Sequence, residues 1–225
     1  MISGVSSPAR RARRREQRES VRAEIIAAAD RFLRERPYRE LSVEVVMAET
    51  GLTRTAFYRH FDDVTDLVLR LLAELGSELY AIAERWGADA GSNYPAPALE
   101  GLSGIVEFFA RNGPLVRAIA EAATTDEQIE RAYRGALEMF VEITTETLDR
   151  LVQAGQLELT DRGALARALN LMNEAYLVDE FGRGDGDPEV ALATLRRVWL
   201  GAIGPLTGGE RLARLAPSPA QLRDE

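Results

Sequence analysis

The side chains whose types and spacing could do chemistry gather in one short stretch, TRTAFYRHF, which runs from Thr53 to Phe61. It contains His60, the only histidine among the 225 residues. If the stretch is helical and turns its apolar residues inward, its outer face carries hydrogen-bonding groups and no carboxylate. That face consists of Thr53, Arg54, Thr55, Tyr58, Arg59 and His60. It suits contact with the phosphates and base edges of DNA. Acidic side chains on this face would be repelled by the phosphates.

The sequence offers little for catalysis. The chain has no cysteine, which excludes disulfides, thiolate metal sites and a cysteine nucleophile, and a single histidine cannot form a multi-histidine metal site. Glu142, Glu146 and Asp149 recur at helical spacing, which is typical of a solvated helix face. The glycines of GRGDGD, residues 182–187, follow a predicted helix rather than a strand, which disfavours nucleotide binding. We therefore expect neither an enzyme nor a bound metal or cofactor.

Two short helices around a glycine turn must position the polar face. Ser42 is the expected N-cap of the first helix, Gly51 lies just past its end, and Thr53 is the expected N-cap of the second helix. The second helix is predicted to run from Arg54 to about Phe61. The two helices share an apolar seam formed by Val45, Val46, Leu52, Ala56, Phe57 and Phe61. This arrangement is typical of a helix-turn-helix.

Further helices are predicted on both sides of this pair. Ser20 is the expected N-cap of a helix that ends before Pro37, and Asp62 or Asp63 caps a long helix from Val64 to about Trp86. Apolar spacing then predicts helices at about 99–112, 114–123, 126–154, 161–181 and 188–204, with breaks at Gly113-Pro114, Thr124-Thr125 and Gly155. Because no alternating strand pattern stands out, the expected fold is all-α.

The charge is unevenly distributed along the chain. Residues 1–60 contain 13 arginines and 8 acidic residues, whereas residues 61–225 contain 15 arginines and 28 acidic residues. A basic end on an acidic body indicates that this end approaches a polyanion. The run Arg10–Arg18 is either an arm along or inside the minor groove of DNA or only a solvated tail, and the sequence leaves both open.

These observations divide the chain into four parts. We expect a flexible basic arm over residues 1–19 and a helix-turn-helix DNA-binding domain over 20–62. A larger helical domain for ligand binding and dimerisation follows over 63–207, with a C-terminal tail over 208–225. No apolar run reaches the roughly 18 residues that a membrane-spanning helix needs, so we expect a cytoplasmic protein with no membrane partner.

The stretch Leu41–Leu72, LSVEVVMAETGLTRTAFYRHFDDVTDLVLRLL, resembles the DNA-binding segment of TetR-family transcriptional regulators. The residues that carry the resemblance are Ala48, Gly51, Thr53, Phe57, Tyr58, His60 and Phe61. Many members have a lysine at the start of the following helix that helps to hold a DNA phosphate, whereas this chain has Val64 there. The resemblance implies three helices that bind DNA, a separate ligand-binding body and a homodimer, and repression is the habit of the family.

The C-terminal part is similar to the EthR-like subgroup of that family. The similarity is strongest in ALNLMNEAYLVDEFG, residues 168–182, with support from GIVEFF at 104–109 and VWLGAIG at 198–204. The resemblance implies a ligand cavity lined by Phe108, Phe140, Thr144, Asn170, Asn173 and Trp199. The residue pattern also supports a cavity, because the amides of Asn170 and Asn173 lie in a helix that is apolar almost all round and need hydrogen-bond partners. They could bind a ligand carbonyl, cap neighbouring helices or pair across a dimer.

We expect the last two long predicted helices to form the dimer interface, and the last of them carries a wide apolar stripe. The stripe consists of Ala191, Leu192, Leu195, Val198, Trp199 and Ala202. A two-fold dimer presents two recognition helices, so the expected partners are a double-stranded, inverted-repeat operator and a small, largely apolar effector. The alternative from another class is a helical scaffold or adaptor protein. The sequence indicates neither the effector nor the operator bases nor the genes controlled.

Overall fold

The computed structural model describes residues 8–89 and 96–203, and within these ranges the chain folds into helices only. The helices are α1 (Pro8–Glu35), the 3₁₀ helix η1 (Tyr38–Glu40), α2 (Val43–Thr50), α3 (Arg54–Phe57), α4 (Val64–Asp89), α5 (Ala96–Ala123), α6 (Glu127–Gln153), α7 (Arg162–Phe181) and α8 (Pro188–Ile203). The predicted all-α fold is therefore confirmed. No helix in the described residues combines the length and apolarity needed to span a membrane.

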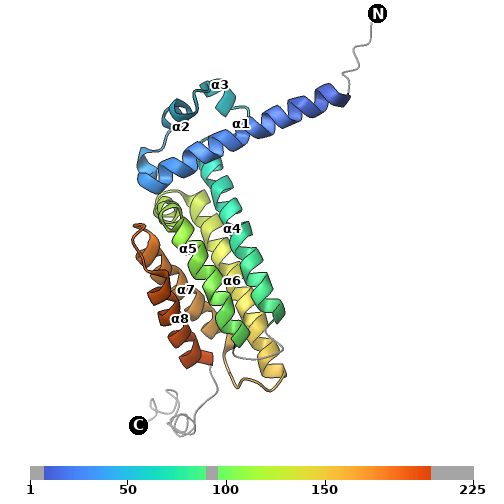
Figure 1. The fold of residues 1–225 in the computed structure, drawn as a ribbon, viewed down its shortest axis with the longest axis vertical. Helices are drawn as coiled ribbons and strands as arrows, with labels where there is room; N and C mark the ends of the chain where they lie inside the picture. Colours follow the sequence, from blue (N-terminus) through green and yellow to red (C-terminus); the bar gives the residue numbers. More distant parts are fainter. Residues whose placement is uncertain (1–7, 90–95, 204–225) are drawn as a thin grey trace, which may run out of the picture.

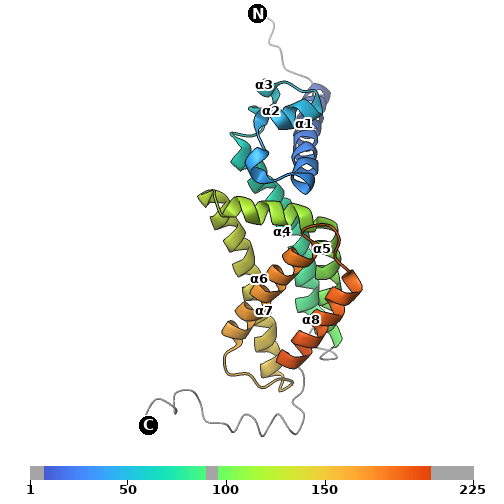
Figure 2. The ribbon, with the colours of Figure 1, turned by 90° about the vertical axis from the view of Figure 1, so that its left-hand side faces the viewer.

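The helices are arranged as a small end and a long body. Helices α1, α2 and α3 form the small end, and α1 crosses the top of the body and projects well beyond it (Figure 1). Helix α4 starts at this end and runs down into the body, where it lies beside α5 and α6, while α7 and α8 lie at one edge (Figures 1 and 2). One continuous helix therefore joins the two parts.

Two apolar cores hold these parts together. The first joins α1, α2 and α3 to the start of α4 and the second half of α5, with Ile25, Phe57, Leu67 and Ile119 fully buried. The second lies within the body, between α5, α6, α7 and α8. Burying one such side chain stabilises the fold by about 1.5–3 kcal/mol. Because α5 contributes to both cores, the small end is packed onto the body.

Helix α1 begins at Pro8 rather than at Ser20, so the predicted start of this helix is wrong. Apolar spacing begins near Ser20, and that is where we expected the N-cap. Between Pro8 and Pro37, however, the sequence consists mostly of arginine, alanine and glutamate, which are strong helix formers, and it contains no glycine. Proline also suits the first turn of a helix. Residues 8–19 are thus helical, whereas residues 1–7 and the predicted tail at 208–225 lie outside the described residues.

Helix α5 runs through the break that we predicted at Gly113-Pro114. The helix bends instead: one part of α5 is seen end-on in Figure 1 and lengthwise in Figure 2, and Pro114 lies inside this helix. Proline has no N–H for the carbonyl four residues earlier and its ring crowds that carbonyl, which kinks a helix. Gly113 allows a close contact, since a Cβ there would lie 2.4 Å from the carbonyl oxygen of Phe181. The bend therefore packs directly against the end of α7.

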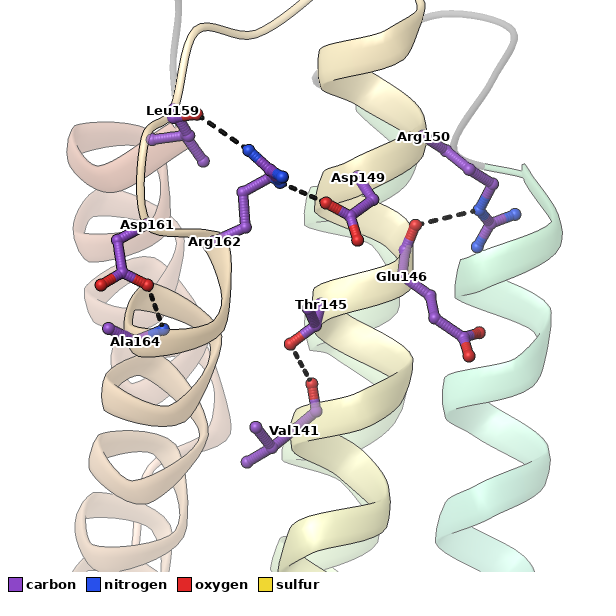
Figure 3. A network of polar contacts seen from close by, with 9 residues as sticks. All are labelled: Val141, Thr145, Glu146, Asp149, Arg150, Leu159, Asp161, Arg162 and Ala164. Carbon is purple, nitrogen blue, oxygen red and sulfur yellow. Dashed lines mark hydrogen bonds and ion pairs between the residues drawn. The ribbon is translucent and has the colours of Figure 1, made fainter.

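The turn between α6 and α7 matches its prediction. Gly155 adopts a left-handed conformation with φ of 69°, and Asp161 caps α7 by accepting a hydrogen bond of 3.0 Å from the Ala164 N–H. Figure 3 shows Arg162 pairing with Asp149 of α6 and donating to the Leu159 carbonyl at 3.2 Å. These bonds fasten the beginning of α7 to the end of α6.

Candidate DNA-contact face and ligand cavity

Three predicted local features shape the helix-turn-helix, two N-cap hydrogen bonds and one left-handed glycine. Ser42 Oγ accepts a hydrogen bond of 3.3 Å from the Val45 N–H, and Thr53 Oγ1 accepts one of 3.3 Å from the Ala56 N–H. Gly51 ends α2 in the left-handed conformation, with φ of 67°. Helix α3 is shorter than predicted and ends at Phe57, although the N–H groups of both His60 and Phe61 still bond to the Phe57 carbonyl.

The six predicted DNA-contact residues differ in exposure from the aromatic residues between and after them. Phe57 and Phe61 are buried, and His60 is half-buried. The other five are exposed: Thr53, Arg54, Thr55, Tyr58 and Arg59. The ring of Tyr58 stands edge-on to that of Phe57, with centroids 5.4 Å apart. The buried aromatic ring therefore supports the exposed one.

One carboxylate lies beside this surface and was missed by sequence reasoning. Glu44 of α2 forms an ion pair of 2.5 Å with Arg54. A side-chain hydrogen bond with Tyr58, followed by the charge of Glu44, raises the pKa of the Arg54 guanidinium. Both partners of the ion pair are 58% exposed, so water screens it and it contributes little to stability. Arg54 can therefore exchange Glu44 for a stronger anionic partner.

The start of α4, residues 62–66, contains no cation. Val64 packs against the first core, and Asp63 caps the helix by accepting a hydrogen bond of 2.8 Å from the Asp66 N–H. Helix α1 supplies positive charge nearby, since Arg22 stands 5.6 Å from the centre of the Phe61 ring. Partial burial lowers the pKa of His60, and the charges of Arg18, Arg22 and Arg59 lower it further.

The body encloses an apolar cavity of about 90 Å³ between α4, α5, α6 and α7. Four of the predicted ligand residues line it: Phe108, Phe140, Asn170 and Asn173. A smaller cavity of about 30 Å³ shares Phe140 and both asparagines with it and adds the other two, Thr144 and Trp199. The structure thus gathers all six predicted residues around one hollow region of the body.

The two asparagines differ in how their amides are used. Asn170 Nδ2 donates to Thr144 Oγ1 at 2.9 Å and to the Ala166 carbonyl at 2.8 Å. Asn173 is only 6% exposed, and its Oδ1 accepts a hydrogen bond of 3.1 Å from Trp199 Nε1. Its Nδ2 has no hydrogen-bond acceptor among the described residues. This buried donor is therefore available to a molecule in the cavity.

A third polar pair in the cavity wall escaped sequence reasoning. The Tyr133 hydroxyl donates a hydrogen bond of 2.5 Å to Glu174 Oε1. Burial, followed by the bond to Glu174, raises the pKa of Tyr133, which keeps the hydroxyl protonated. Glu174 lies in α7, directly after Asn173. Tyr133 lies on another helix, and no local pattern links it to Glu174.

The apolar stripe expected at the dimer interface is mostly internal, so that prediction is wrong in its residues. Ala191, Leu195 and Trp199 are buried in the second core of the chain itself. Trp199 is held there by its bond to Asn173. The large apolar side chains of α8 that are exposed are Val190, Val198 and Leu200, and only Val198 belongs to the predicted stripe.

The described residues hold no cluster of three or more side chains suited to a metal ion. The α6 carboxylates that recur at helical spacing do not converge either. Glu142 and Glu146 are exposed, and Figure 3 shows Asp149 turned toward Arg162. The described residues thus contain no convergent catalytic set on this helix.

Comparison with known proteins matches both parts of the chain. Residues 25–71 match the family "Bacterial regulatory proteins, tetR family", and residues 98–204 match "Transcriptional regulator EthR, C-terminal domain". The chain is 27% identical over 186 residues to the HTH-type transcriptional regulator EthR of Mycobacterium tuberculosis, covering 80% of this chain and 85% of that protein. It is 28% identical over 190 residues to EthR of Mycolicibacterium smegmatis, with the same coverage.

Solved structures share the fold. A putative TetR-family transcriptional regulator from Syntrophomonas wolfei superposes with a TM-score of 0.70 at 16% identity, covering 84% of this chain and 98% of that one. The regulatory protein TetR from Rhodobacter sphaeroides superposes with a TM-score of 0.66 at 19% identity, covering 80% and 97%. The chain is therefore an EthR-like member of the TetR family of DNA-binding transcriptional regulators, which are not enzymes.

Proposed function

We propose that the chain is a homodimeric, cytoplasmic repressor that binds an inverted-repeat operator and leaves it when a small, largely apolar molecule enters the body. The observation that carries this proposal is an apolar cavity with an unused buried amide, joined by α4 to the carboxylate-free outer face of α3. A helical scaffold or adaptor would need neither feature.

The exposed face of α3 would enter the major groove. Arg54, Thr55 and Arg59 would contact base edges, and Thr53, Tyr58 and His60 would contact phosphates, which the exposure of all but His60 supports. Replacing Arg54 with alanine should relax the sequence preference. Tyr58→Phe should weaken binding to all sequences alike.

Helices α7 and α8, which lie side by side, offer the surface for a homodimer (Figure 2). Each helix has an exposed stripe of small or apolar residues at three- and four-residue spacing. The stripes are Ala164, Ala168, Leu171 and Ala175 on α7, and Val190, Thr194, Val198 and Gly201 on α8. Two such helices from each subunit would pack as a four-helix interface around a two-fold axis. The two copies of α3 would then reach two half-sites of opposite orientation.

The cavity would select an apolar molecule that has one hydrogen-bond acceptor. Asn173 Nδ2 is the available donor, and a ketone or amide carbonyl is a suitable acceptor. Ligand sites usually measure about 300–1,000 Å³, which is more than the cavity of about 90 Å³. A ligand of ordinary size must therefore displace the surrounding helices, and the population shifts toward the displaced arrangement.

Two polar contacts would carry that displacement to the DNA-binding end. Leu72, Leu75 and Leu79 of α4 line the cavity, and near the start of the same helix Thr65 Oγ1 donates a hydrogen bond of 2.6 Å to Asp126 Oδ2. At the bend of α5, Arg34 of α1 donates to the Arg111 carbonyl at 2.6 Å. Movement of α4 or α5 would thus change the spacing of the two recognition helices.

The operator can be tested by selecting binders from a random pool of duplex DNA with purified protein at moderate salt. Enrichment of an inverted repeat supports a dimer that reads sequence. Failure to enrich any sequence, even at low salt, contradicts the operator and favours the scaffold alternative, because DNA binding through phosphates strengthens as salt is lowered.

Medium-chain methyl ketones and alkanes of equal length test the ligand site. We expect the ketones to raise the melting temperature of the protein and to release the selected operator, and the alkanes to do so less. Asn173→Ala should abolish the difference between ketone and alkane, while Thr145→Val, outside the lining of both cavities, should retain it. Equal effects of both compounds on the unaltered protein would contradict a role for the amide.

A further inference from the structure

Within the described residues, the N-terminal half of α1 is a helix that packs against nothing. Residues 10–20 are all exposed, and apolar contacts begin only at Val21. Arginines at three- and four-residue spacing form one face of these turns, and we call this set the arginine face: Arg11, Arg14, Arg15, Arg18 and Arg22. The same five side chains line a surface groove together with Glu19 and His60. The groove thus runs along α1 toward the turn after α3.

The arginine face is poorly compensated within the chain. Its one acidic neighbour in the groove is Glu19, which pairs with Arg15 at 2.8 Å, and both side chains are largely exposed. Such a pair contributes little. Like charges three or four residues apart destabilise a helix. An anionic partner would remove this repulsion.

The position of the arginine face points to DNA as that partner. Helix α1 projects past α3 at the same end of the molecule (Figure 1), and the groove ends at His60, beside the exposed face of α3. The start of α4, which follows Phe61 in the chain, has no cation but exposes Asp62 and Asp63. The arginine face of α1 can therefore supply cations for phosphates next to the site that α3 reads.

We propose that the arginine face is a second phosphate-binding surface, which lies on the DNA backbone beyond the bases that α3 reads. The inference rests on the proposed operator binding. Because a helix with side chains is about 10–12 Å wide and the minor groove only about 6 Å, this helix crosses the backbone and does not enter the groove. Residues 8–20 span about 20 Å at 1.5 Å per residue, which corresponds to about six base pairs.

The length of the DNA duplex distinguishes binding by the arginine face from binding by the recognition helix α3. We would compare the selected operator trimmed to its enriched bases with the same operator carrying long flanks. Wild-type protein should bind the flanked duplex more tightly. The double variant Arg11→Gln/Arg18→Gln should lose that gain, with a salt slope lower by about 0.9 for each phosphate that it no longer neutralises and affinity reduced more than about ten-fold. On the trimmed duplex the two proteins should bind alike.

A matched variant controls for net charge. Arg13→Gln/Arg31→Gln removes the same charge from the opposite side of α1, where both side chains are exposed, and should keep the gain from the flanks. Gln17→Pro leaves every arginine in place but breaks the helix among exposed residues. It should lose the gain, because the arginines no longer share one face.

The base composition of the flanks distinguishes binding by a helical N-terminal segment from binding by an extended arm. An arm inside the minor groove would prefer A·T-rich flanks, where the groove is narrow, whereas a helix on the backbone should gain equally from A·T-rich and G·C-rich flanks. The proposal is overturned if flanks add nothing, if only A·T-rich flanks add affinity, or if both double variants lose equally. If the protein selects no operator at all, the proposed function is refuted instead. Binding to the trimmed duplex tests the proposed function separately from the arginine face.

Discussion

The two ends of the molecule differ in how their side chains fill space. Beneath the DNA-contact face, Ile25, Val46 and Phe57 have no exposed surface and pack from α1, α2 and α3 into one core. In the body, four helices leave a hollow between them, and a buried amide in its wall has an unused donor. The filled core beneath α3 keeps the exposed surface of this helix in one shape. The hollow body has space that a bound molecule could fill.

This difference indicates that rigidity and the capacity to change shape lie in different parts of the chain. A close-packed core transmits strain and resists a change of volume, so the α3 surface can move only as a whole with α4. A cavity lacks packing partners that a ligand could supply. Under the proposed function, the body is therefore the part in which ligand binding changes the structure, and the DNA-binding end responds to that change.

The largest expected effect comes from removing one aromatic ring from each region. Phe57→Ala should lower the free energy of unfolding by about 3–5 kcal/mol, because it opens a void in a filled core. Phe140→Ala should lower it by about half as much or less, since this half-buried ring already borders the cavity. Urea denaturation of both variants measures the difference. Equal losses would contradict the contrast between a filled and a hollow region.

The two regions also differ in how far the sequence predicts them. The DNA-contact face depends on neighbours in the chain: Ser42 and Thr53 as N-caps and Gly51 as the left-handed residue. Such local rules are visible in the sequence. What the sequence did not reveal was Glu44 beside Arg54, because that pair joins two helices whose crossing no local pattern specifies.

The cavity is built from residues far apart in the chain, so its parts were predicted from family resemblance and not from spacing. The bond between Tyr133 and Glu174 joins positions 41 residues apart. The buried stripe of α8 was assigned to a dimer because helical periodicity shows that a face is apolar, but not which neighbour covers it. Likewise, the exposed turns of α1 have no apolar periodicity from which a helix could be predicted.

The second prediction adds a methyl group where α5 bends beneath the DNA-binding end. Gly113→Ala should lower the free energy of unfolding by about 1–3 kcal/mol, because the new Cβ meets the backbone of Phe181, which cannot move aside. Gly135→Ala in α6, where nothing lies within 4 Å of a Cβ, should raise it by about 0.5–1 kcal/mol. Thermal and urea unfolding measure both. Opposite signs for two identical substitutions would confirm that the bend is a tight junction.

The third prediction concerns the contact between the start of α4 and the start of α6. The hydrogen bond from Thr65 is the largest cause of the lowered pKa of Asp126. A lowered folded-state pKa stabilises the fold above the unfolded value of about 3.9, and this contribution is lost as the pH falls through the folded value. Thr65→Val should thus lower the free energy of unfolding at neutral pH by about 0.5–1.5 kcal/mol.

Denaturation at several pH values tests that assignment. The difference between wild type and Thr65→Val should shrink as the pH falls below about 4, since protonated Asp126 no longer benefits from the bond as an anion. Thr145→Val serves as the control, because Thr145 Oγ1 donates to the Val141 carbonyl within α6 and has no charged partner there. A pH-independent loss in Thr65→Val would show that its hydroxyl acts through packing and not through Asp126.

The smallest expected effect comes from His60, where the DNA-contact face meets the arginine face. In the free protein, partial burial and then Arg18, Arg22 and Arg59 lower its pKa, so the imidazole is neutral at pH 7. A DNA phosphate would offset those charges and raise the pKa, so DNA binding should take up a proton. Operator affinity should therefore rise several-fold as the pH falls from about 7.5 to about 5.5. His60→Gln should match wild type at the upper pH and lose this rise, which fluorescence anisotropy can measure. An unchanged rise in His60→Gln would place the titrating group elsewhere and would separate His60 from the phosphate that the arginine face is proposed to hold.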